Sequence, residues 1–160
     1  MNNDEKALFT NFWTNESKTT RNVIARIPEG SDYRPDPKAR TAREIAWLIV
    51  REDIVLIEGL EKGRLDWMES PAPATVKEIL DTYDRHHADL ATRLKRLDTA
   101  GWERDVPFMF QGQEVMKMSG SDNAWGFLFD QIHHRGQLST YLRPMGSTVP
   151  QIYGPSADEP

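Results

Sequence analysis

The chain contains no cysteine among its 160 residues. A disulfide framework and a nucleophilic thiol are therefore excluded, and thiol chemistry would need a thiol brought in by a substrate. Residues 1–5 lack the cationic and apolar regions of a signal peptide, which together with the missing cysteines predicts a cytoplasmic protein. No apolar run approaches the ~20 residues that span a bilayer, so no membrane partner is expected.

The chain also lacks an excess of positive charge. Its formal net charge is -5 at pH 7, which gives no electrostatic basis for binding nucleic acid. Glycine-rich phosphate loops, the G-x-S-x-G nucleophile elbow and the H-E-x-x-H zinc motif are absent from the sequence. These absences exclude the commonest nucleotide-binding and hydrolase signatures, and nothing in the sequence requires an organic cofactor.

The hydrophobic pattern is helical along most of the chain. We expect one domain over residues 1–160, with a tail from 146, and helices over 6–27, 41–62, 76–97 and 122–143. The second helix opens on the capping-box spacing of Thr41 and Glu44. Residues 102–118 alternate in part and predict a long crossover with a short hairpin. The predicted class is all-α, an antiparallel four-helix bundle with a long crossover before the last helix.

The last predicted helix is apolar on two sides. At 100° per residue, one face carries Phe127, Asp130, His134, Leu138 and Tyr141, and the opposite face carries Trp125, Leu128, Phe129 and Ile132. A helix that is apolar on two sides is buried on two sides. We therefore expect one face to fill the core and the other to form the seam of a homodimer.

Two polar positions interrupt these apolar faces. Asp130 and His134 lie one helical turn apart and can point at a common centre, and Glu52 falls on the apolar stripe of the second helix. Such groups either pair with each other or with an internal arginine such as Arg135, or they hold a metal ion. Two carboxylates and one imidazole suit a hard cation such as Mn, Fe or Mg better than a soft metal.

The C-terminal third carries a resemblance to a known family. The stretch His133-His134-Arg135-Gly136-Gln137-Leu138-Ser139-Thr140-Tyr141-Leu142-Arg143-Pro144-Met145-Gly146, continued by residues 149–158, resembles the last helix and tail of the DinB/YfiT-like superfamily, and residues 37–47 are similar to it more weakly. The resemblance implies a four-helix bundle with a divalent metal on three side chains, one from the second helix and two from the last. His134 matches the final ligand, Asp130 replaces a frequent histidine, and Leu48 occupies the position of the second-helix ligand.

The resemblance implies a metal-dependent enzyme that acts on small molecules, either a thiol S-transferase or a hydrolase, with Zn, Ni, Mn or Fe as the metal. Asp130 and His134 are then the expected catalytic residues and, with Glu52, the expected ligands. The expected pocket is lined by the apolar or aromatic residues Leu48, Trp47, Phe127, His87 and Tyr141, although His87 on an apolar stripe also fits a core histidine.

Two further hypotheses remain open at this stage. In one, the bundle holds no metal and an apolar pocket raises the pKa of Asp130, so that this carboxylate acts as a general base in proton abstraction. In the other, the protein is a non-catalytic binding or dimerisation protein. The sequence does not identify a substrate.

Overall fold

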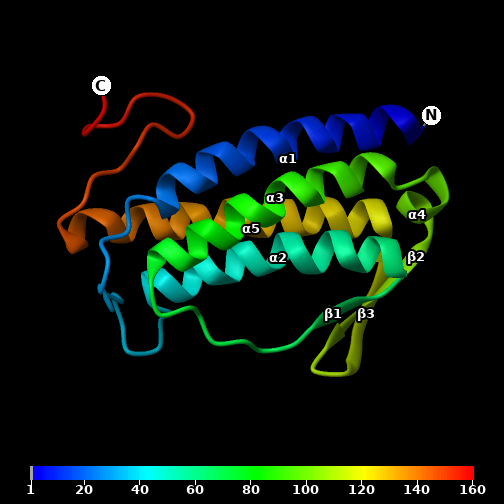
Figure 1. Ribbon diagram of the computed structural model, residues 1–160, viewed down its shortest axis with the longest axis horizontal. Coiled ribbons are helices and arrows are strands. Elements are labelled where there is room, and N and C mark those ends of the chain that lie inside the picture. The colour runs from blue at the N-terminus through cyan, green and yellow to red at the C-terminus, as the bar shows by residue number, and fades with distance from the viewer. Residues whose placement is uncertain (1) are drawn as a thin grey trace.

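The computed structural model describes residues 2–160 and is mainly helical (Figure 1). Its long helices are α1 (Asn2–Ile24), α2 (Ala42–Lys62), α3 (Val76–Arg96) and α5 (Gly120–Leu142), with the short α4 (Thr99–Glu103) and a terminal 3-10 turn η1 (Arg143–Met145). Three strands, β1 (Leu65–Trp67), β2 (Asp105–Phe110) and β3 (Gln113–Ser119), form a small sheet. The expected class is thus right in its helical content. Of the sheet, only the hairpin of β2 and β3 was expected, and β1 and α4 were not.

The capping residues explain where the middle helices begin. Thr41 accepts a hydrogen bond from the Glu44 amide while the Glu44 carboxylate accepts one from the Thr41 amide, which is the predicted capping box. Thr75 and Glu78 repeat this arrangement at the start of α3. Helix α2 ends at Gly63, whose φ of 80° lies in the left-handed region that a residue with a Cβ rarely adopts.

The direction of the helices differs from the expected antiparallel order. In Figure 1, α1 and α5 run one way and α2 and α3 run the other. Helices α2 and α3 each pack against the other and each contacts one helix of the opposite direction, α5 and α1 respectively. Because α2 and α3 are parallel, the chain must return along the bundle between them, so the long crossover spans residues 63–75. The expected position before the last helix is wrong.

Residues 102–118 form part of the sheet instead of a long crossover. Strand β2 pairs antiparallel with β3 around Gln111 and Gly112, as the partial alternation suggested, and parallel with β1. Strand β1 lies close against α2 because Gly59 has no side chain, since a Cβ there would meet the Leu65 side chain at 2.7 Å. The sheet consequently covers one end of α2 and α5, where it borders the cavity described below.

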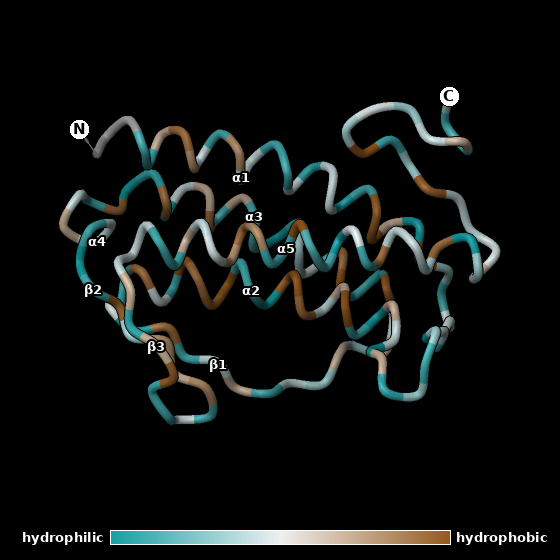
Figure 2. The backbone as a smooth tube through the Cα atoms, turned by 180° about the vertical axis from the view of Figure 1, so that it is seen from behind, coloured by the Kyte–Doolittle hydropathy of each residue, from teal (hydrophilic) through white to brown (hydrophobic). Residues whose placement is uncertain are grey.

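The core consists of two apolar clusters. Figure 2 shows that hydrophobic and hydrophilic residues alternate along the long helices that supply them. One cluster contains Ile45, Ile49 and Leu138, and the other contains Phe9, Leu56 and Leu128. Polar residues are buried between these clusters along the helices, namely Ser17, Thr20, Glu52, Asp53, Gln131 and Arg135. A polar layer inside an apolar bundle is costly unless its members are paired, so its contacts identify where the fold is specialised.

The two faces predicted for the last helix need correction. Leu128 is 2% exposed and belongs to the core, whereas Phe129 is 62% exposed. On α1, Phe12 is also exposed. The line of α5 that faces the core passes instead through Ala124, Leu128, Gln131, Arg135, Leu138 and Leu142. The hydropathy pattern did not predict this buried face because two of its innermost residues are a glutamine and an arginine.

Candidate metal centre

Three side chains from two helices meet at one point of the bundle. Glu52 comes from α2, and Asp130 and His134 come from adjacent turns of α5, which packs against α2. One ligand atom from each residue lies within 4.8 Å of the other two. The carboxylate of Glu52 is buried, while Asp130 and His134 face the adjoining cavity. These are the three ligand positions predicted from the sequence, and the fold brings all three together.

The His134 ring is held by contacts at both of its nitrogens. Its Nε2 lies 3.5 Å from Oδ2 of Asp130, and its Nδ1 lies 3.2 Å from Oε1 of Gln137, one turn further along α5. A hydrogen bond at one ring nitrogen fixes the orientation of the ring and the tautomer in which the other nitrogen is a free donor atom. Gln137 Oε1 accepts from Nδ1–H, which leaves Nε2 on the side of Asp130 and Glu52; it can donate to Asp130 when protonated and act as a ligand atom when it is not.

The charges in this cluster are strongly coupled. Burial, followed by the proximity of Asp130, raises the pKa of Glu52 well above its usual value. The neighbouring His134 imidazole lowers the pKa of Asp130 to about 2, and Asp130 in turn raises the pKa of His134. The expectation that an apolar pocket would raise the pKa of Asp130 is therefore wrong, because the imidazole outweighs the burial of a side chain that is still 55% exposed.

Glu52 does not pair with an internal arginine. Arg135, the suggested partner, instead forms an ion pair with Glu16 on α1, and Tyr153 from the C-terminal tail donates to the same Glu16 carboxylate. Within residues 2–160, atom Oε2 of Glu52 is buried without a hydrogen-bond partner. A buried carboxylate oxygen with no donor loses its hydration without compensation, so this atom is available to a cation.

A second buried carboxylate, that of Asp53, connects α2 to the neighbouring helices. Asp53 accepts hydrogen bonds at Oδ1 from the Trp13 indole N–H (2.7 Å) and from the Gln131 amide (2.8 Å). Burial raises the pKa of Asp53 to about 6 despite these two donors. These hydrogen bonds link α2 to α1 and α5 at the level of Glu52, and they fix the turn of α2 from which Glu52 projects.

The cluster opens into a cavity of about 500 Å³ between α2, α5 and the sheet. This volume is in the range of sites for small organic molecules. Besides the three cluster residues, its wall consists of Arg40, Leu48, Trp67, Glu69, Phe108, Phe110, Met116, Met118, Asn123, Gly126 and Phe127. The wall is mainly apolar, so a ligand would lie against hydrophobic surface with its polar end at the carboxylates and imidazole.

The predicted pocket residues separate into two groups. Leu48 and Phe127 line this cavity, and Trp47 lines a neighbouring one. His87 instead packs between the Trp13 and Tyr83 rings, with ring centroids 4.4 and 5.7 Å away, and Tyr141 packs against Tyr33 in the core. Tyr141 therefore belongs to the core and His87 is half-buried against two aromatic rings, and neither lines the two cavities.

Sequence reasoning missed the part of the wall that the sheet supplies. Phe108 and Phe110 alternate on β2, and Met116 and Met118 alternate on β3, so that each pair faces the cavity. Such spacing of two is the signal of a strand with one apolar face, and it was present in the sequence. Arg40, in the loop before α2, was also missed, because a loop arginine carries no periodic signal.

Comparison with known proteins shows which proteins share this fold. The chain is 26% identical over 158 residues to the uncharacterized protein YrdA of Bacillus subtilis (strain 168). This match covers 94% of this chain and 89% of that protein. Its fold is similar to the crystal structure of a DinB-like protein from Bacillus cereus ATCC 10987, with 26% identity, a TM-score of 0.73 and coverage of 91% of this chain and 95% of that one.

A second crystal structure, of the DinB-like protein YjoA from Bacillus subtilis, has a TM-score of 0.69 at 17% identity and covers 95% of this chain and 98% of that one. At that identity the likeness concerns the fold alone. The model of the DinB family matches residues 1–160. The resemblance inferred from the last helix and tail is thereby confirmed, and the chain belongs to the DinB family.

Proposed function

We propose that the protein binds one divalent metal ion through Glu52, Asp130 and His134 and uses it in a reaction on a small molecule held in the adjoining cavity. The observation that carries this proposal is the convergence of three ligand atoms within 4.8 Å of one another, together with the buried, unpartnered Oε2 of Glu52. A cation would offset both the desolvation of Glu52 and the repulsion between two neighbouring carboxylates.

The chemistry of the donors narrows the choice of metal. Two carboxylates and one imidazole favour Mn or Fe, with Zn and Ni as further candidates, and a soft ion is disfavoured because no thiolate or thioether takes part. Leu48, one turn before Glu52 on α2, lines the same cavity and contributes no donor. With three protein ligands, the cavity side of the site is left for substrate.

The reaction class proposed from family membership is transfer to or from a thiol, with hydrolysis as the nearest alternative. A divalent ion in such a site supplies Lewis acidity, which lowers the pKa of a thiol or water that reaches it. The thiol would come from a substrate, because the chain has no cysteine. Phe108 and Phe127, whose ring centroids are 5.8 Å apart, would hold an apolar substrate body and keep water from it.

The protein's own groups would position the reacting end. Asp130 and His134 face the cavity, and the contact of His134 with Gln137 prevents the imidazole from turning away. In the metal-free alternative, a carboxylate would act as the general base. Glu52 fits that role better than Asp130, since burial raises the pKa of Glu52 whereas His134 lowers that of Asp130.

Replacement of Glu52 by glutamine tests the metal proposal. The amide keeps the shape of the side chain but removes the negatively charged oxygen ligand. We therefore expect the dissociation constant for Mn²⁺ to rise by on the order of 100-fold, because even the loss of a residue that only supports a ligand can cost that much. Isothermal titration of chelator-stripped protein measures this. Glu69→Gln is the matched control, because Glu69 lines the same cavity outside the cluster. Equal weakening in both variants, or none in Glu52→Gln, contradicts the proposal.

We also propose a homodimer that uses the outer surface of α1 and α5. Leu8, Phe12 and Phe129 are 50%, 47% and 62% exposed, and Trp125 lies between Phe12 and Phe129 with ring centroids 6.1 and 6.0 Å away. Exposed aromatic side chains that touch one another form the kind of apolar patch that commonly mediates association. The patch combines two helices, whereas the sequence had assigned the seam to the last helix alone.

Phe129→Glu should convert this dimer into a monomer, because a charge at the centre of a buried apolar interface cannot be solvated. Sedimentation velocity at micromolar concentration gives the mass of each form. Val115→Glu, which places the same charge on an exposed apolar position of β3 away from the patch, should remain dimeric. A monomeric parent protein would remove the proposal.

A further inference from the structure

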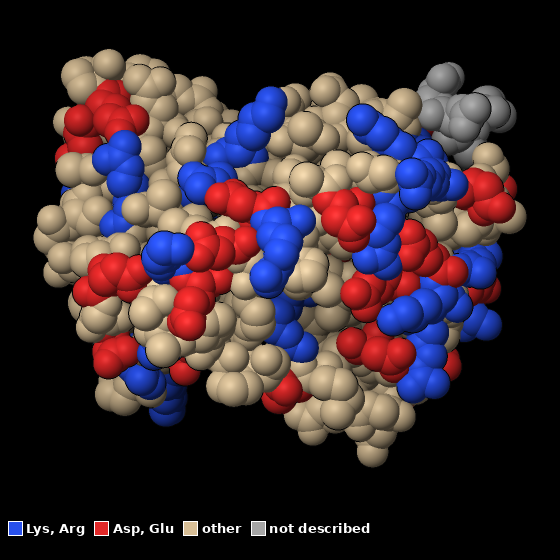
Figure 3. Space-filling model, viewed as in Figure 1, with Lys and Arg blue, Asp and Glu red and all other residues tan. Residues whose placement is uncertain are grey.

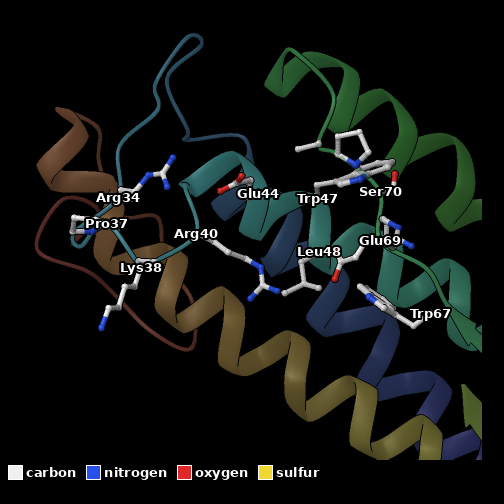
Figure 4. A pocket seen from close by; sticks show the side chains of 14 residues that line it. Arg34, Pro37, Lys38, Arg40, Glu44, Trp47, Leu48, Trp67, Glu69 and Ser70 are labelled. Atoms are coloured by element: carbon white, nitrogen blue, oxygen red, sulfur yellow. The ribbon is translucent and has the colours of Figure 1, made fainter. Parts of the chain in front are cut away.

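A second cavity, of about 400 Å³, adjoins the first. Arg40, Leu48, Trp67 and Glu69 line both, so the two cavities meet at these residues. Together they are called the hollow here, with the first cavity, which reaches Glu52, Asp130 and His134, as its inner part. The inner part is mainly apolar. The outer part is bordered by the loop before α2 and by the segment after β1, and it carries several charged side chains (Figure 4).

Positive charge is in excess in the outer part. Its wall contains Arg34, Lys38, Arg40 and Arg51 but only two carboxylates, Glu44 and Glu69. The chain as a whole has the opposite sign, with a net charge of -5. Over the face of the molecule in Figure 3, basic and acidic side chains are intermingled. A concave, locally cationic region in an acidic protein attracts anionic ligands to that region in particular.

Two of these charges, those of Arg51 and Glu44, have hydrogen-bond partners within the fold. Arg51 donates to the backbone oxygen of Met68 and lies over the Trp67 ring at 4.4 Å, and Glu69 is close enough to act on its charge. Glu44 caps α2, and Arg34 is among the charges that act on it. Arg51 and Glu44 are therefore accounted for by hydrogen bonds within the fold, and neither of them pairs with Arg40.

Arg40 differs from Arg34 and Lys38 in its position, because it alone of these three lines both cavities. Its guanidinium extends from the loop toward Leu48, whereas Lys38 points away from the hollow (Figure 4). Within residues 2–160, Arg40 is exposed and forms no hydrogen bond or ion pair. Its positive charge reaches the candidate centre. Burial and Asp130 raise the pKa of Glu52, and Asp130 raises the pKa of His134, whereas Arg40 acts to lower both.

We propose that Arg40 is a specificity residue that binds an anionic group, a carboxylate or a phosphate, of the small molecule whose apolar body lies against Phe108 and Phe127. The planar guanidinium can donate two parallel hydrogen bonds to either anion. This inference rests on the proposed function in one respect, since the bound anion would place the other end of the molecule at Glu52, Asp130 and His134. The substrate class is thus a small organic acid or phosphate ester with a hydrophobic portion.

Three naphthalene probes of similar size test the inference, namely 1-naphthylacetate, 1-naphthyl phosphate and the neutral 1-naphthylacetamide. Binding to chelator-stripped protein is measured by calorimetry at fixed ionic strength. Without metal, an acid cannot gain affinity by coordinating a metal ion, so tighter binding of the acid than of the amide would come from the arginine. We expect at least one acid to bind at least about tenfold more tightly than the amide, as a charge-assisted bidentate contact gives.

Arg40→Gln should bring the acids and the amide to equal affinity, while Arg85→Gln, which removes the same charge from an exposed position of α3, should retain the preference. The acid whose advantage depends on Arg40 identifies the anion. The inference is overturned if all three probes bind the parent protein with equal affinity, or if none of them binds. It is also overturned if the preference for an acid survives in Arg40→Gln. Failure of metal binding would overturn the proposed function and leave this result standing.

Discussion

Replacement of Leu48 by histidine is expected to tighten the binding of Zn²⁺ or Ni²⁺ by at least about 100-fold. Leu48 lies one helical turn before Glu52 on α2 and lines the same cavity as Glu52, Asp130 and His134. A new imidazole there would add a fourth protein donor of the type these metals prefer. By resemblance, this is also the position from which other DinB-like proteins supply their second-helix ligand. Competition titration with a chromophoric chelator measures the change.

A histidine placed elsewhere on α2 separates this effect from nonspecific binding. Val55 is partly buried on the same helix and does not line the cavity, so Val55→His should leave the affinity as it is. Equal affinities of the parent protein and Leu48→His would mean that position 48 does not reach the centre or that the parent site already has its full set of donors. Either result would refute the assignment of Leu48 as the lost ligand position.

Replacement of Arg135 by methionine is expected to lower the free energy of unfolding by about 3 kcal/mol. Arg135 is 1% exposed and pairs with Glu16, whose side chain is only 14% exposed. The arginine also donates to the Tyr153 hydroxyl at 2.6 Å and lies over the Tyr153 ring. Methionine fills most of the volume but leaves Glu16 without its countercharge in a largely dehydrated position, which accounts for the cost.

Two controls divide this loss into its parts. Tyr153→Phe keeps the ring over the guanidinium and removes only the hydroxyl, so we expect a loss of about 1 kcal/mol. Arg143→Met breaks an ion pair with Asp158 in the same tail, but Arg143 is 54% exposed, so its loss should be about 0.5 kcal/mol or less. Urea denaturation of the three variants tests this order. A loss in Arg135→Met no larger than in Arg143→Met would contradict the importance given to the buried pair.

The sequence predicted the parts of the fold that follow from local rules. The capping box at Thr41 and Glu44 correctly marked the start of α2, and helical periodicity located the long helices to within a few residues. The direction of α3 was not predictable in this way, because periodicity describes a helix but not its orientation relative to its neighbours. The crossover over 63–75 contains strand β1, three residues long, whose partner β2 is about 40 residues away in the chain.

The candidate centre was predictable where spacing alone determines proximity. Asp130 and His134 are four residues apart on one helix, so they had to lie on the same face. Adding Glu52 required the packing of α2 on α5, which the family resemblance supplied. The hypothesis of a raised pKa for Asp130 was wrong because hydropathy indicated burial, while the larger effect, the imidazole 3.5 Å away, lowers that pKa. Arg40 could be found only once the loop before α2 was placed beside the cavity.

The central claim, that Glu52, Asp130 and His134 together hold one metal ion, is tested most directly by a crystal structure of protein loaded with Mn²⁺, with anomalous data collected above and below a metal absorption edge. The account predicts one strong anomalous peak per chain within bonding distance of a carboxylate oxygen of Glu52, an oxygen of Asp130 and Nε2 of His134. No peak at this position in fully loaded crystals, or a peak held by other residues, would contradict it.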